Sequence, residues 1–185
     1  MASGKKNHGK GGKEQRYELY LMRHGIAADS DGTTPADDAK RPLTPEGKLK
    51  LRASARGLEV TGADLDWIVS SPLKRAAETA EIIAAELAPE AVLEHCEALA
   101  PGMLTAQKLI SFLSQNAERH RVLAIGHEPS LSELASELMG ASQRANFAFR
   151  KGGCCLITFD EFPPKSPGLL NWWLTPRLMR KLNAH

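Results

Sequence analysis

Residues 17–25 read YELYLMRHG, in which a mostly apolar run ends abruptly at Arg23, His24 and Gly25. A short apolar run that stops at a glycine is typical of a buried β-strand that leads into a loop. Further short strands are predicted over residues 67–70, 92–95, 122–125, 154–159 and 170–174. The first strand therefore places a guanidinium group and an imidazole ring at its carboxyl end.

Segments with helical spacing separate most of these strands, over residues 46–58, 73–87, 104–113 and 130–139. The first helix follows Thr44-Pro45 and the last ends at Gly140, which are common start and stop signals. Alternation of strand and helix predicts an α/β fold, a three-layer α/β/α sandwich around a mostly parallel sheet. Only a turn, residues 163–168, joins the last two strands, so we expect an antiparallel C-terminal hairpin there.

The composition indicates one globular domain with a basic arm in front of it. The chain has 185 residues and is 42% apolar, enough for one full core. Residues 1–16 carry five cations, one acid and no large apolar side chain, so we expect this arm to be disordered. Residues 17–185, with 19 basic and 21 acidic side chains, form the expected catalytic domain. The high pI thus belongs to the arm, and no nucleic-acid partner is expected.

The expected location is the cytoplasm. No apolar run approaches the roughly 18 residues that span a bilayer, and no signal-peptide core follows the basic start, so no membrane association is expected. Cys96, Cys154 and Cys155 offer neither a CxxC pair nor an even disulfide framework. We interpret them as core residues in a reducing compartment.

Four side chains stand where predicted strands end: Arg23 and His24 after the first, Arg75 after residues 67–70, and His127 after residues 122–126. In an alternating α/β sheet such ends converge on one crevice. Two guanidinium groups and two imidazole rings suit a compact dianion such as phosphate. Gly25 would let the backbone approach that anion closely. The guanidinium charges would repel a divalent ion, so no metal is expected.

Four strings carry a family resemblance: LYLMRHG (19–25), RPLTPEG (41–47), SSPLKRAAETA (70–80) and IGHEP (125–129). In order and spacing they resemble the successive motifs of the histidine phosphatase superfamily, whose fold is phosphoglycerate-mutase-like. The strings LAPG (99–102) and LNWWLTP (170–176) resemble its small phosphohistidine phosphatase branch, the SixA type. The resemblance covers residues 17 to about 182.

The resemblance implies a two-step phosphoryl transfer that needs no metal and no cofactor. His24 would attack phosphorus, while Arg23, Arg75 and His127 would bind the non-bridging oxygens. Arg41 would be a fourth cation at the substrate, and Gly25 would also line it. The implied partner is a phosphorylated protein of a signalling relay, or alternatively a small phosphorylated substrate.

The sequence offers no evident general acid for a phosphate ester. Glu94 and Glu97 are the two candidates, and both suit a solvated face at least as well. Imidazole leaves readily, whereas an alkoxide needs a proton, so a site without an acid favours P–N over P–O cleavage. A small-molecule phosphomonoesterase and a non-catalytic phosphate-binding module remain the alternatives, and the oligomeric state stays open.

Overall fold

Six strands form one sheet in the computed structural model, which describes residues 16–29, 34–141 and 147–182. The strands are β1 (Tyr17–Arg23), β2 (Trp67–Ser70), β3 (Val92–His95), β4 (Arg121–Gly126), β5 (Cys154–Phe159) and β6 (Leu169–Leu174). Their order is β3-β2-β4-β1-β5-β6. The first four run parallel, whereas β5 is antiparallel to both β1 and β6. The predicted C-terminal hairpin is therefore confirmed.

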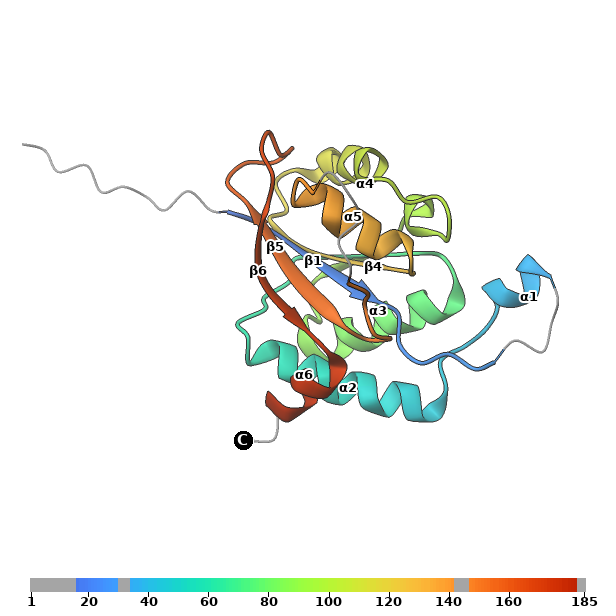
Figure 1. The fold of residues 1–185 in the computed structure, drawn as a ribbon. Coiled ribbons are helices and arrows are strands. Elements are labelled where there is room, and N and C mark those ends of the chain that lie inside the picture. The colour runs from blue at the N-terminus through green and yellow to red at the C-terminus, as the bar shows by residue number, and fades with distance from the viewer. Residues whose placement is uncertain (1–15, 30–33, 142–146, 183–185) are drawn as a thin grey trace, which may run out of the picture.

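Helices cover both faces of this sheet (Figure 1). They are α1 (Pro35–Ala39), α2 (Pro45–Glu59), α3 (Lys74–Leu87), α4 (Ala106–Leu113), α5 (Ser130–Leu138) and α6 (Pro176–Leu182), with short 3₁₀ turns η1 (Glu97–Leu99) and η2 (Ser114–Asn116). Buried residues of α4 and α5 pack on one face, and those of α2, α3 and α6 pack on the other. The three-layer sandwich predicted from the sequence is thus the observed fold.

The alternation of side chains along β1 divides the core into these two halves. Leu19 and Leu21 pack with α4 and α5, whereas Tyr20 and Met22 pack with α2 and α3. Successive strand residues point to opposite faces, so a central strand covered on both sides must be apolar throughout. This explains why the run in residues 17–22 is nearly continuous. It also makes Arg23 and His24 the first strongly polar side chains beyond the core.

Helix α6 has no counterpart among the expected elements, and it closes the face that carries α2. Met179 is its buried residue. A Cβ atom added to Gly57 of α2 would lie 1.8 Å from the carbonyl oxygen of Met179, so the two helices meet backbone to backbone. Glycine is required at that crossing because any side chain would push α6 away. Helix α6 is thereby packed beside α2.

Helix α1 is also unpredicted, because its five residues include none that is buried and so carry no apolar periodicity. Thr34 caps it by accepting a hydrogen bond from the amide of Asp37. Residues 1–15 of the expected arm lie outside the described residues. Arg16, the last residue of that arm, forms an exposed ion pair with Asp160 at 3.2 Å. None of the described helices is long and apolar enough to cross a bilayer.

Candidate active site

The sheet topology brings His24 and His127 together. Strands β1 and β4 are parallel neighbours, and Arg23 lies opposite Gly126 in the register. The residues that follow these strands, His24 and His127, therefore lie at the same end of the sheet. Their imidazole ring centroids are 5.0 Å apart. Arg75 lies in the first turn of α3, the helix that follows β2. Strand β2 is the other neighbour of β4, so Arg75 is at the same end of the sheet. The carboxyl ends of β1, β4 and β2 therefore lie side by side, as the sequence predicts.

His24 is buried and held in one tautomer. Its Nδ1 atom lies 2.7 Å from the carbonyl oxygen of Gly25, and a carbonyl only accepts, so Nδ1 carries the proton. Nε2 is then left with a free lone pair. Burial, with help from the charges of His127 and Arg75, lowers the pKa of His24 to about 3. The ring is consequently neutral at pH 7, which a nitrogen nucleophile requires.

Backbone hydrogen bonds on both sides hold the peptide of His24. Its amide donates to the carbonyl of Gly126 at 3.2 Å, and its own carbonyl accepts from the amide of Gly152 at 3.0 Å. The first bond continues the β1–β4 ladder, and the second ties the residue to the turn before β5. The imidazole therefore extends from rigid backbone, as precise positioning of a reacting group demands.

His127 carries an unused hydrogen-bonding atom. Its Nε2 atom lies 2.9 Å from the hydroxyl of Ser71, whereas Nδ1 is buried without a partner among the described residues. Burial, and next the charge of Arg75, lower the pKa of His127 to about 4. An unpaired buried nitrogen is costly, and an oxyanion beside the ring would relieve that cost. Ser71 is a site residue that sequence reasoning did not single out.

Arg23 is anchored at one end and unpaired at the other. Nη1 donates to the carbonyl of Phe149 at 2.9 Å, whereas Nε is buried without a partner in the described part of the chain. Burial lowers the pKa of Arg23, and nearby Glu128 opposes this while Arg75 and Arg150 add to it. Several cations thus share one small region and repel one another. Such a region favours an anion of high charge.

Arg75 is buried, and both of its terminal nitrogens bond to Asp38. Nη1 donates to the Asp38 carbonyl at 2.8 Å, and Nη2 lies 3.1 Å from carboxylate oxygen Oδ2. The other carboxylate oxygen accepts from Nη1 of Arg41 at 2.7 Å. Arg41, the predicted fourth cation, therefore shares one carboxylate with Arg75. The guanidinium groups of Arg41 and Arg75 hold the pKa of Asp38 below its ordinary value, so Asp38 is ionised at neutral pH.

Gly25, the other residue predicted to line the substrate, sits in close packing behind the nucleophile. Its amide donates to the hydroxyl of Thr79 at 3.0 Å and so is engaged within the protein. A Cβ atom at this position would lie 3.2 Å from a methyl carbon of Leu43. The glycine allows residues 25–28 to pass close to the segment before α2, where the Ala28 amide donates to the Pro42 carbonyl at 2.9 Å.

The two candidate acids do not join this group. Glu94 lies in β3, three strand positions from β1, which corresponds to on the order of 14 Å. Glu97 is exposed and lines a separate cavity of about 570 Å³ with His95 and Lys108. Among the described residues, no group of three or more His, Cys, Asp or Glu side chains is placed to hold a metal ion. Asp38 of α1 does bring a carboxylate to the site, through its bonds to Arg75 and Arg41.

A family model agrees with the order of the motifs. The model of the histidine phosphatase superfamily (branch 1) matches residues 19–100. This span contains Arg23, His24, Arg41 and Arg75, and His127 follows beyond it. An uncharacterized protein of Picosynechococcus is 36% identical over 140 residues, which are 74% of this chain and 81% of that protein.

Two further relatives have an assigned activity in their names. The phosphohistidine phosphatase SixA of Escherichia coli is 28% identical over 175 residues, 90% of this chain and 99% of that protein. The solved structure of the protein histidine phosphatase SixA complexed with tungstate matches with a TM-score of 0.73 at 26% identity. That match covers 86% of this chain and 97% of the other.

Proposed function

The chain belongs to the histidine phosphatase superfamily, and we propose that it removes phosphate from phosphohistidine on a protein through a covalent intermediate on its own His24. The observation that carries the proposal is the bond from Nδ1 of His24 to the Gly25 carbonyl, which leaves Nε2 unprotonated beside a cluster of cations. Its relatives include phosphohistidine phosphatase SixA of Escherichia coli. The proposed protein substrate is a phosphorylated component of a signalling relay.

In the first step, Nε2 of His24 attacks phosphorus, and the bond from phosphorus to the substrate imidazole breaks. The substrate reacts with its second ring nitrogen protonated, so the leaving imidazole takes the electron pair, keeps that proton and departs neutral. In the second step, water adds to phosphorus and the bond to Nε2 breaks. Dihydrogen phosphate leaves with both protons of the water, and Nδ1 of His24 keeps the proton that it donates to Gly25. Neither step consumes an external proton.

The surrounding arginines and His127 are proposed to bind the non-bridging oxygens during both steps. Arg23 and His127 each have a buried nitrogen without a partner in the described protein, Nε and Nδ1 respectively, and these are available for phosphate oxygens. Arg75 offers a guanidinium that now bonds to Asp38. Preorganised donors of this kind stabilise the charge that spreads over the three oxygens in the transition state. Arg41 is proposed to contribute through the carboxylate it shares with Arg75.

The state of Asp38 supports phosphohistidine over alkyl phosphate as the substrate. An alkoxide leaving group needs a proton, and a general acid contributes roughly 10²–10⁴ in rate. Asp38 is ionised because Arg41 and Arg75 face its carboxylate, so it has no proton to give. Glu94 and Glu97 lie elsewhere. A phosphoramidate bond to imidazole avoids the difficulty, since imidazole is a weak base.

A direct comparison of substrates tests the proposal. The purified protein is assayed with EDTA present on a phosphohistidine peptide and on glycerol phosphate, and kcat/KM is compared. We expect phosphohistidine to be preferred by 100-fold or more, and His24→Asn to remove both activities. A preference for glycerol phosphate would make the protein a small-molecule phosphomonoesterase. Tight phosphate binding without turnover of either compound would make it a phosphate-binding module.

A further inference from the structure

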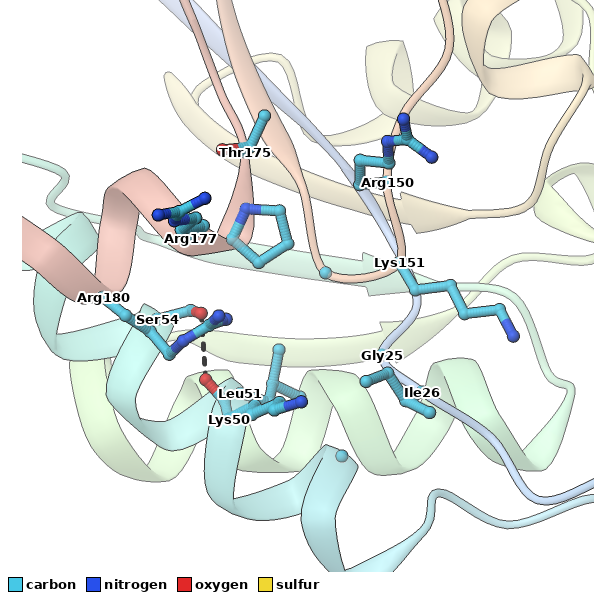
Figure 2. Close-up of a pocket in the computed structure, with 13 residues that line it drawn as sticks. Gly25, Ile26, Lys50, Leu51, Ser54, Arg150, Lys151, Thr175, Arg177 and Arg180 are labelled. Atoms are coloured by element: carbon cyan, nitrogen blue, oxygen red, sulfur yellow. Dashed lines mark hydrogen bonds between the residues drawn. The ribbon is translucent and has the colours of Figure 1, made fainter.

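A second pocket opens beside the nucleophile and is strongly cationic. Its volume is about 320 Å³, and it lies between the start of α2, the turn before β5 and the start of α6 (Figure 2). Five of its lining residues are cations, and no lining residue is acidic: Lys50, Arg150, Lys151, Arg177 and Arg180. We call this pocket with its five cations the basic groove.

Most of the positive charge in the basic groove is not neutralised by the protein. Lys50 pairs with Glu46 at 2.5 Å. Arg150, Lys151, Arg177 and Arg180 form no ion pair with any residue that the structure describes. Several unpaired cations around one concave surface repel one another, and an anionic ligand relieves that repulsion. The groove therefore has the charge of a binding site for an acidic group.

The groove borders the candidate active site. Gly25, which follows His24, forms part of its wall, as does Gly152. The amide of Gly152 donates to the carbonyls of Arg23 and His24, each at 3.0 Å. Arg150 acts on both regions, because it lines the groove and its charge also lowers the pKa of Arg23. A ligand whose phosphate reaches His24 can thus extend toward the groove.

We propose that the basic groove docks an acidic segment of the phosphoprotein next to its phosphorylated residue, an inference that rests on the proposed function. The cations come from three separate elements, α2, the turn at residues 150–152, and α6. Each is exposed or half-buried, and none is buried as a phosphate-binding arginine would be. Dispersed, solvated cations suit several carboxylates along a chain better than one compact phosphate. Ile26, Leu51 and Pro176 provide apolar wall for the rest of that chain.

Charge reversal on α6 tests the docking. Arg177→Glu/Arg180→Glu changes two groove cations, whereas Lys181→Glu makes the same kind of change on the same helix outside the groove lining. Neither variant alters a residue of the candidate active site. Thermal unfolding of both variants checks that the fold is kept. Each protein is assayed on two phosphohistidine peptides of equal length, one with Asp and Glu beside the phosphorylated residue and one with Asn and Gln.

We expect the wild-type protein to prefer the acidic peptide about tenfold in kcat/KM, mainly through KM, and to lose that preference at high salt. The double reversal should remove the preference and leave free phosphohistidine and the neutral peptide unchanged. Lys181→Glu should keep most of the preference for the acidic peptide. Equal use of the two peptides by the wild-type protein would overturn the proposal. So would an equal loss in the two variants, or a loss in the double variant on every substrate.

A binding measurement separates this proposal from the proposed function. Fluorescence anisotropy follows the acidic peptide without phosphate, compared with its amide counterpart. Preferential binding of the acidic peptide, lost in the double reversal, would support the groove even if no phosphohistidine substrate were hydrolysed. Absence of that preference, with phosphohistidine hydrolysed normally, would overturn the groove and leave the proposed reaction standing.

Discussion

The carboxylate of Asp38 is bonded to Arg75, with Oδ2 3.1 Å from Nη2. A negative charge of the protein itself thus pairs with the guanidinium that is proposed to bind the phosphate. The carbonyl of Asp38 accepts a second bond from Arg75 Nη1 at 2.8 Å. Only the first of these bonds depends on negative charge. The carboxylate therefore competes with a bound oxyanion, while the carbonyl keeps Arg75 oriented.

Asp38→Asn should strengthen oxyanion binding. The substitution removes the competing charge and leaves the backbone carbonyl in place. We expect the inhibition constant of vanadate or tungstate to fall about two- to fivefold, the effect of one partly exposed ion pair. Competitive inhibition measures it. Asp64→Asn, which removes an ion pair with Arg121 at the far end of β4, is the control and should change nothing. Weaker inhibition in Asp38→Asn would mean that the carboxylate orients Arg75.

His24→Asn should abolish turnover without unfolding the protein. The asparagine amide can still donate to the Gly25 carbonyl, so the local hydrogen bond survives while the nucleophile is lost. We expect kcat to fall by at least about 10³-fold, as loss of a covalent nucleophile does elsewhere. Intact-mass spectrometry of an alkali-quenched reaction should show one phosphate on the wild-type protein and none on the variant. His95→Asn, on edge strand β3, should keep both activity and labelling; labelled His24→Asn would point to a different nucleophile.

Arg75→Lys should recover only part of the activity lost in Arg75→Ala. Removing a preorganised oxyanion donor typically costs about 2.7–4 kcal/mol, or 10²–10³ in kcat. Lysine keeps the charge but lacks the planar fork by which Arg75 now holds two acceptors on Asp38. We expect the lysine variant to fall between wild type and alanine, while Arg52→Lys on the surface of α2 stays at wild-type activity. Full activity in Arg75→Lys would indicate that charge alone suffices.

The two buried histidines should make the protein sensitive to mild acid. Their pKa values are lowered to about 3 and about 4, whereas an unfolded histidine has a pKa near 6.5. Below pH 6.5 the unfolded chain binds protons that the folded protein does not, so stability present at pH 7 is lost as the pH falls toward 4. Each histidine contributes a slope of up to about 1.4 kcal/mol per pH unit.

Denaturant unfolding at pH 7 and pH 5 measures this slope. The loss between the two pH values should be smaller in His24→Asn, which has one fewer buried imidazole. An unchanged loss would show that His24 does not titrate in this range on unfolding. His95→Asn again serves as the control, because that side chain is exposed.

The sheet and its strand ends could be predicted because burial imposes a pattern on the sequence. β2, β3 and β5 have the predicted bounds, β4 is one residue longer at each end, and β6 begins one residue earlier. Strands covered on both faces are mostly apolar, so a polar residue after the apolar run marks the end of the strand, as Arg23 does after residues 19–22. The four motif residues follow from the same logic, since strand order decides which ends meet.

The partners of these side chains could not be predicted, because no periodic pattern encodes them. Asp38 lies on α1, a five-residue helix without a buried residue, and reaches Arg75 from 37 positions away in sequence. Helix α6 does carry a start signal in the sequence. Thr175-Pro176 repeats the start Thr44-Pro45 of α2, and the hydroxyl of each threonine accepts from an amide in the first turn. The basic groove combines three distant segments, which sequence spacing does not bring together.

The dependence of rate on the leaving group separates the two enzyme hypotheses most sharply. The value of kcat/KM reports the first step, in which the departing oxygen would need a proton. Asp38 is ionised between Arg41 and Arg75, and the candidates Glu94 and Glu97 lie elsewhere, so none of these three is expected to supply it. Rates on phosphate esters should therefore fall steeply as the leaving alcohol becomes more basic, with aryl phosphates between phosphohistidine and alkyl phosphates. Measured across a series of substituted phenyl phosphates, the plot of log kcat/KM against leaving-group pKa should have a large negative slope. Asp38→Asn and Glu97→Gln should leave that slope unchanged. A shallow slope in the wild-type protein that becomes steep in either variant would identify the substituted residue as the general acid. Phosphate esters would then be the preferred substrates.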